Sequence, residues 1–102
     1  MKKILVVCTS GLGTSLAMRL SIERFIRERN LKVKVEHADM GSANFIEADL
    51  IIGAKQVISC LSKQNDIETI GLEDIVRRRY IEEQLLNCDT IQTWLKEKEG
   101  LR

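Results

Sequence analysis

The chain has 102 residues, of which 44% are hydrophobic and 30% charged, and its 16 Lys and Arg against 15 Asp and Glu give a net charge of +1. This length suits one compact domain, and the near-neutral charge gives no electrostatic support for binding nucleic acid. Because no apolar run approaches the roughly 18–20 residues of a membrane helix, and the apolar stretch after Lys3 is too short for a signal peptide, we expect a soluble cytoplasmic protein.

The first half of the chain begins with Ile4–Val7, a continuous apolar and largely β-branched run that predicts a strand buried on both faces. A helix is expected from Thr14 to about Arg29, with Asn30 as its left-handed cap. Its apolar stripe consists of Met18, Ile22, Phe25 and Ile26. Residues 32–38 then alternate apolar and polar, which predicts a half-exposed edge strand with Val33, Val35 and His37 on one face.

The second half continues the alternation. Residues 39–48 are long enough for a short crossover helix with Ser42 as N-cap, and residues 49–54 predict a second buried strand. A short amphipathic segment over 55–63 precedes a further strand over 66–72. A helix is expected from Glu73 to about Leu86, with Ile75, Val76, Ile81, Leu85 and Leu86 mostly inward, before an interruption at 87–89 and a helical tail over 90–100.

This order of elements predicts an α/β fold with a four-stranded parallel sheet and helices on both faces. We expect one domain over residues 1–87, with residues 88–102 as a helical tail packed on it. In open parallel sheets the active crevice lies beyond the carboxyl ends of the strands, and Cys8 follows the first predicted strand directly.

The segment CTSGLGTS, residues 8–15, has the composition of an anion-binding loop. Gly11 and Gly13 permit unusual dihedral angles, so successive backbone N–H groups can surround one point, and the following helix directs its unpaired N–H groups there. Thr14 or Ser15 would be the helix N-cap. Such a site suits a phosphoryl group, and its field favours the thiolate form of Cys8 as a nucleophile. The alternative is a buried, unreactive cysteine before a tight turn.

Two related phosphate-binding motifs do not fit this loop. Low-molecular-weight cysteine phosphatases use Cys-x5-Arg-Ser/Thr, but Thr14 stands where the arginine would be, and the chain has no proline for an Asp-Pro acid loop. The loop also lacks the lysine of a Walker A motif. A phosphate-binding loop with a nucleophile but no arginine favours holding a phosphoryl group and passing it on over hydrolysis.

The strand ending in Cys8 and the pattern C-x-x-G-x-G-S/T-S that opens a helix resemble the IIB (EIIB) component of the bacterial phosphoenolpyruvate-dependent sugar phosphotransferase system (PTS), of the ascorbate and galactitol type. This resemblance implies a flavodoxin- or Rossmann-like fold and a phosphotransferase activity without cofactor or metal. It implies that a phosphohistidine on a IIA partner phosphorylates Cys8, and that the phosphoryl group passes to a carbohydrate bound by the membrane IIC permease. The residues carried over as the phosphate-binding loop are Thr9, Ser10, Gly11, Leu12, Gly13, Thr14 and Ser15.

Two alternatives stay open: a low-molecular-weight phosphatase or arsenate-reductase-like enzyme, and a regulatory IIB-like module. No functional role is predicted for the other side chains that could take part in chemistry. His37 is interpreted as structural or exposed because it lies far along the chain from Cys8. Cys60 is interpreted as core, and Cys88 as a residue at a helix break that could be exposed and has no assigned role. The three cysteines, with no C-x-x-C pair, indicate neither a disulfide framework nor a zinc site. Trp94 is interpreted as a packing anchor.

Overall fold

The computed structural model describes residues 2–8, 12–43, 45–61 and 67–100. Their strands form one parallel sheet in the order β2–β1–β3–β4. The strands are β1 (Lys2–Cys8), β2 (Val33–Asp39), β3 (Leu50–Ala54) and β4 (Glu68–Leu72). The predicted four-stranded parallel sheet is confirmed, and the half-exposed strand β2 lies at an edge, as its alternating pattern indicates.

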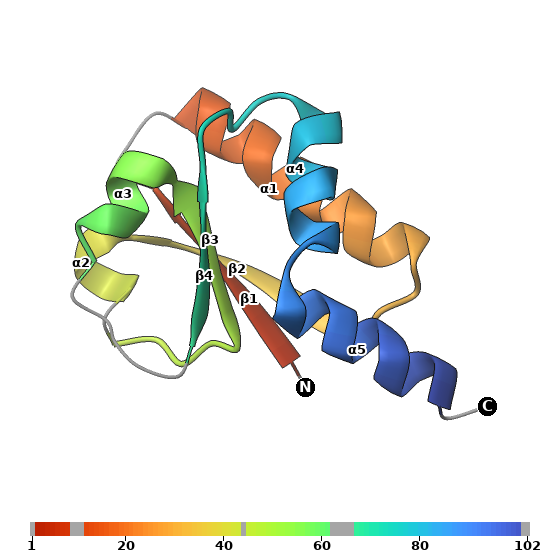
Figure 1. The fold of residues 1–102 in the computed structure, drawn as a ribbon. Coiled ribbons are helices and arrows are strands. Elements are labelled where there is room, and N and C mark those ends of the chain that lie inside the picture. Colours follow the sequence, from red (N-terminus) through yellow and green to blue (C-terminus); the bar gives the residue numbers. More distant parts are fainter. Residues whose placement is uncertain (1, 9–11, 44, 62–66, 101–102) are drawn as a thin grey trace.

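Helices cover both faces of the sheet (Figure 1), which confirms the predicted α/β architecture. Three of them lie on one side, namely α1 (Leu12–Glu28), α4 (Arg78–Leu86) and α5 (Asp89–Gly100). The short helices α2 (Met40–Ala43) and α3 (Lys55–Ser59) lie on the other side. No helix in the described part of the chain is long and apolar enough to cross a membrane.

Strand β1 forms the centre of the protein because both of its faces are buried. Ile4 and Val6 pack into the larger core cluster, which includes apolar residues of α1, α4 and α5. Leu5 and Val7 pack into the smaller cluster on the side of α2 and α3. All four side chains are fully buried. The prediction that this continuous apolar run forms a strand buried on both faces is therefore confirmed.

Helix α1 ends as its sequence predicts. Asn30 adopts a left-handed conformation with φ of 54°. The Leu31 N–H donates to the Ile26 carbonyl oxygen at 3.1 Å, and the Asn30 N–H donates to the Arg27 carbonyl oxygen at 3.1 Å. These bonds satisfy carbonyl groups that the helix end would leave unpaired, and they turn the chain directly into β2.

The connection from β4 to α4 differs from the prediction, because α4 begins at Arg78 rather than near Glu73. Asp74 Oδ1 accepts hydrogen bonds from the backbone N–H groups of Arg77 and Val76, each at 2.9 Å. These bonds lower the pKa of Asp74 and hold residues 74–77 in a turn that competes with the helix. Val76, predicted to face inward, is therefore 57% exposed.

The crossover after β2 is also shorter than expected. Helix α2 has four residues, whereas the prediction extended from 39 to 48. The Ser42 N–H donates to Asp39 Oδ1 at 2.7 Å, so Asp39, the last residue of β2, caps this turn, and the predicted N-cap at Ser42 is wrong. The cap fixes the side chain of Asp39 at the carboxyl end of β2.

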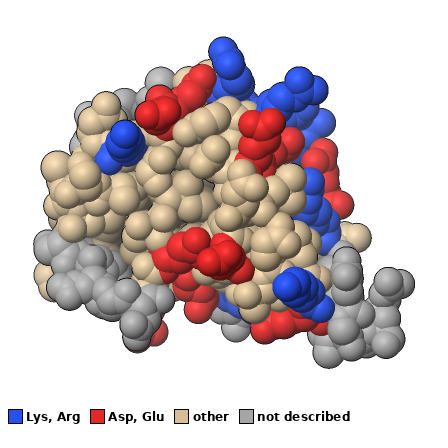
Figure 2. All heavy atoms as spheres, viewed as in Figure 1, with Lys and Arg blue, Asp and Glu red and all other residues tan. Residues whose placement is uncertain are grey.

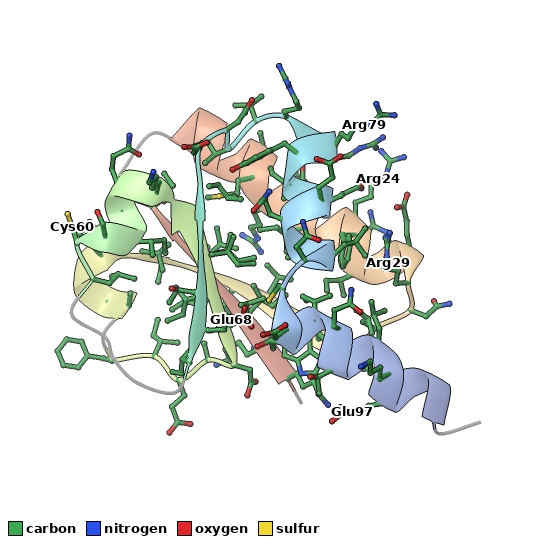
Figure 3. All side chains as sticks on the ribbon, in the orientation of Figure 1. Arg24, Arg29, Cys60, Glu68, Arg79 and Glu97 are labelled. Atoms are coloured by element: carbon green, nitrogen blue, oxygen red, sulfur yellow. The ribbon has the colours of Figure 1, made fainter. Side chains whose placement is uncertain are left out.

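Helix α5 is attached to the sheet by Glu68 of β4. The Glu68 carboxylate accepts hydrogen bonds from the Thr90 backbone N–H at 2.8 Å and from the Thr90 hydroxyl at 2.7 Å. Ile91 and Trp94 of α5 are buried in the larger core cluster, with 0% and 6% exposure. Trp94 is thus the packing anchor that the amphipathic pattern predicted. Figure 3 shows Glu68 directed from β4 towards the start of α5.

Candidate functional site

Cys8 is the last residue of β1, which lies between β2 and β3. Because all four strands are parallel, their carboxyl ends share one edge of the sheet, and the connections that follow them gather there. Cys8 is 8% exposed. The sequence predicted this position at the end of an interior strand.

His37 lies beside Cys8, which corrects its interpretation as a residue remote from the thiol. The Nε2 atom of His37 is 2.8 Å from the Sγ atom of Cys8. In the sheet, Val6 is paired with His37 and Cys8 with Asp39. Since alternate residues of a strand share a face, Cys8 and His37 extend to the same side from neighbouring strands. The two residues are 29 positions apart in the sequence but lie on neighbouring strands of the sheet.

The distance between Cys8 and His37 is short enough for a hydrogen bond between the thiol and the imidazole. Two protonation states fit it: a thiol that donates to a neutral Nε2, or a thiolate that accepts from a protonated ring. A thiolate is the nucleophilic form of cysteine, and a neighbouring imidazolium favours it. The pair thus has the chemistry for a sulfur nucleophile together with a group that can hold its proton.

Asp39 adds a negative charge to this edge of the sheet. Its pKa is lowered, mainly because its carboxylate accepts the backbone hydrogen bond from Ser42, with the Ser42 side chain, Gly41 and the charge of His37 as further contributions. The Asp39 carboxylate is therefore ionised at neutral pH, at the same edge of the sheet as Cys8 and His37. Cys8, His37 and Asp39 come from two adjacent strand ends.

The predicted phosphate-binding loop is only partly described. Thr9, Ser10 and Gly11 lie outside the described residues. Leu12, Gly13, Thr14 and Ser15 form the backbone of the first turn of α1, which begins two residues earlier than predicted. Thr14 and Ser15 therefore lie inside the helix and are not its N-cap, and Gly13 is helical rather than part of the turn. The first backbone N–H groups of α1 have no partner within the helix, and they follow Cys8 after three intervening residues.

Gly53 of β3 allows the close approach of β3 to the end of β1. A Cβ atom at this position would lie 2.6 Å from the Val7 carbonyl oxygen, closer than side chains tolerate, with Ile58 Cδ1 at 3.4 Å. Sequence reasoning treated Gly53 as part of an apolar strand, although a glycine inside a strand often marks such an approach. The backbone next to Cys8 is therefore held by strand-to-strand contact.

The other two cysteines exchange their predicted environments. Cys60, predicted to be core, is exposed at the end of α3, where Figure 3 shows it directed away from the protein. Cys88, predicted as a residue that could be exposed, is 3% exposed, and burial raises the pKa of its thiol to about 11. Among the described residues, Cys8 is thus the cysteine with an imidazole partner.

The outer surface of α1 combines apolar and charged side chains. Leu16 and Leu20, one helical turn apart, are each 53% exposed. Ion pairs join Arg19 to Glu23 at 3.1 Å and Arg24 to Glu28 at 3.0 Å. Figure 2 shows basic and acidic side chains side by side at the upper right of this face, over α1 and α4, and Figure 3 places Arg24 and Arg79 there. The three exposed arginines at 77–79 belong to this surface of mixed charge.

A cysteine at the carboxyl end of a central parallel strand, joined to an imidazole and followed by a helix start, defines a thiol-based site in an open α/β sheet. Residues 3–87 match the family described as "PTS system, Lactose/Cellobiose specific IIB subunit". The chain belongs to this family of IIB components, and it is accordingly a sugar phosphotransferase component. The matched range ends within the turn after α4.

Two known proteins are similar to this chain. The ascorbate-specific PTS system EIIB component of Mycoplasma pneumoniae is 26% identical over 84 residues, which cover 80% of this chain and 88% of that protein. A solved structure of the lactose-specific IIB component domain of the Streptococcus pneumoniae PTS is 20% identical, covers 93% of this chain and 95% of its own, and gives a TM-score of 0.54. The second likeness supports the fold. The matched family and these two proteins are all PTS IIB components, but they are named for different sugars.

Proposed function

We propose that this protein is a phosphocarrier in which Cys8 accepts a phosphoryl group from a phosphohistidine of a IIA partner. The phosphoryl group then passes to a carbohydrate bound by a membrane IIC permease, so the chain would work in the cytoplasm. The observation that carries the proposal is the Cys8–His37 contact of 2.8 Å at the carboxyl end of the central strand. Residues 1–87 would form the phosphocarrier domain, and residues 88–102 a helical extension of it.

The loading step forms one bond and breaks one. The Cys8 sulfur attacks phosphorus as a thiolate, and the phosphorus–nitrogen bond of the donor breaks with its electron pair remaining on the donor imidazole. The product is a phosphocysteine. Backbone N–H groups of the segment from Thr9 to Ser15 would bind the phosphoryl oxygens, since N–H groups at a helix start favour anions.

Transfer is favoured over hydrolysis by the composition of the loop. Thr14 occupies the position at which cysteine phosphatases have arginine, and the chain contains no proline for their acid loop. A charged clamp binds a phosphoryl group with strong bidentate hydrogen bonds. A carrier without that clamp binds its cargo less tightly, which suits a group that must leave again.

The partners would dock on the edge of the sheet where Cys8 lies. Leu16 and Leu20 form an exposed apolar pair on the half of α1 that follows the loop, and Val76 is exposed in the connection after β4 at the same edge. Exposed apolar side chains with charged neighbours are typical of transient protein interfaces. The ion-paired arginines Arg19 and Arg24 would lie at the rim of this contact.

The proposal is tested by intact-mass measurement after incubation with phosphoenolpyruvate, the general phosphotransferase proteins and candidate IIA proteins. We expect an increase of one phosphoryl group in the wild type and in Cys60→Ser, which removes an exposed thiol at the end of α3. Cys8→Ser should show no increase. An unchanged mass with every IIA protein, or phosphorylation that persists in Cys8→Ser, would reject the proposal.

A further inference from the structure

The resemblance to IIB components gives roles to Cys8 and its loop, but it gives none to the imidazole of His37. That ring is on the edge strand β2, and its Nε2 atom is 2.8 Å from Cys8 Sγ. The His37 residue is exposed, whereas Cys8 is 8% exposed. The ring therefore touches both the sulfur that would react and the surrounding solvent.

We propose that His37 is the proton acceptor of Cys8: its neutral Nε2 takes the proton of the thiol when the sulfur becomes a nucleophile. The S–H bond breaks, the electron pair stays on sulfur, and the proton forms an N–H bond on Nε2. The sulfur pair then forms the bond to phosphorus as described above, and the imidazolium later returns its proton to water. The phosphoryl step rests on the proposed function, whereas the proton transfer is a property of this chain alone.

The titratable groups near His37 come from its own strand, from β1 and from the helices packed against them. From β1 the neighbouring titratable group is Cys8 itself, and from β2 it is Asp39, whose pKa is lowered in part by the charge of His37. Helix α2 contributes no titratable side chain. On α1 the first charged residues, Arg19 and Glu23, neutralise each other in an ion pair.

An imidazole gives this site something that backbone N–H groups cannot give. Amides stabilise a thiolate once it exists, but they do not accept its proton. A histidine titrates near neutral pH and exchanges its proton with water. With His37 in place, the thiol of the buried residue Cys8 need not meet a solvent base directly, and Cys8 can react without moving outward.

The direct test measures the thiolate of Cys8 with no partner protein present. Thiolate absorbs in the ultraviolet, and the difference between Cys60→Ser and the double variant Cys60→Ser/Cys8→Ser isolates the signal of Cys8. Cys88 adds no thiolate at neutral pH because burial raises its pKa to about 11. We expect His37→Gln, which keeps a polar side chain but accepts no proton, to lower the Cys8 thiolate signal at neutral pH roughly tenfold.

The matched control is Lys34→Gln, an exposed substitution on the same strand β2. It should leave the thiolate signal unchanged, and circular dichroism checks that both variants keep the fold. Alkylation of Cys8 by iodoacetamide, followed by peptide mass, should slow by a similar factor in His37→Gln. A second variant, His37→Ala, should recover part of the alkylation rate when imidazole is added to the buffer.

The outcomes separate this proposal from the proposed function. Equal thiolate signals and alkylation rates in the wild type and His37→Gln would overturn the role of His37, whether or not Cys8 carries phosphate. A lost thiolate signal in His37→Gln supports the proposal even if no IIA protein loads the wild type, in which case the phosphocarrier function alone fails. Slower loading with an unchanged thiolate signal would also overturn it.

Discussion

Replacing Gly53 by Ala tests whether the end of β1 is held by close backbone packing. The new Cβ atom would start 2.6 Å from the Val7 carbonyl oxygen, so β1 and β3 must separate by several tenths of an ångström or lose hydrogen bonds between them. Overpacking of this kind costs about 1–3 kcal/mol. The free energy of unfolding should fall by that amount, with a drop in Tm of about 4 °C or more.

Two other glycines give a graded control. A Cβ atom at Gly71 would lie 3.2 Å from Lys55 Cα, and at Gly41 it would lie 3.6 Å from a side-chain oxygen of Asp39. Gly71→Ala should therefore cost less than Gly53→Ala, and Gly41→Ala should change stability by no more than about 0.5 kcal/mol. Urea unfolding followed by circular dichroism measures all three. A Gly53→Ala protein as stable as Gly41→Ala would refute the reasoning.

Three further predictions concern the attachment of α5, the docking surface and the cysteines. Burial raises the pKa of Glu68, but hydrogen bonds, led by those from Thr90, outweigh it and leave the pKa below its ordinary value of 4.5. The charged carboxylate therefore stabilises the fold above that pH, so Glu68→Gln should lower the free energy of unfolding by about 1–2 kcal/mol at pH 7. This difference between variant and wild type should shrink as the pH falls below the lowered pKa, and a constant difference would contradict the prediction. Leu20→Asp should slow phosphoryl uptake from a IIA protein without changing the Cys8 thiolate signal, and unchanged uptake kinetics would exclude Leu20 from the interface. In native protein a thiol reagent should modify Cys60 rapidly and Cys88 only after unfolding, and rapid native labelling of Cys88 would contradict its burial.

Local patterns were sufficient to predict the architecture. Ile4–Val7 is apolar at every position because it is buried on both faces. In β2, Val33 and Val35 pack against the larger core cluster, whereas Lys34 between them is exposed. The left-handed cap at Asn30 follows from residue type alone. Each of these features depends on neighbours within a few positions along the chain, so sequence carries the signal directly.

The contact between Cys8 and His37 could not be predicted in this way, because it depends on the register between two strands. Shifting that pairing by one residue would put His37 on the other face of the sheet. The burial of Cys88 and the exposure of Cys60 likewise depend on how α5 and α3 pack against the sheet, and the local sequence does not specify that packing. The prediction that Val76 faces inward was wrong for a local reason. Asp74 accepts backbone hydrogen bonds that form a turn, so α4 begins only after it.

The central claim is that the phosphoryl group resides on the sulfur of Cys8, and phosphorus NMR of the loaded protein tests it most directly. A phosphorus–sulfur bond and a phosphorus–nitrogen bond give separate resonances, and His37 is the one histidine of the chain. We predict a single phosphorus–sulfur resonance that is absent from Cys8→Ser. A phosphorus–nitrogen resonance that persists in Cys8→Ser and disappears in His37→Gln would contradict the claim.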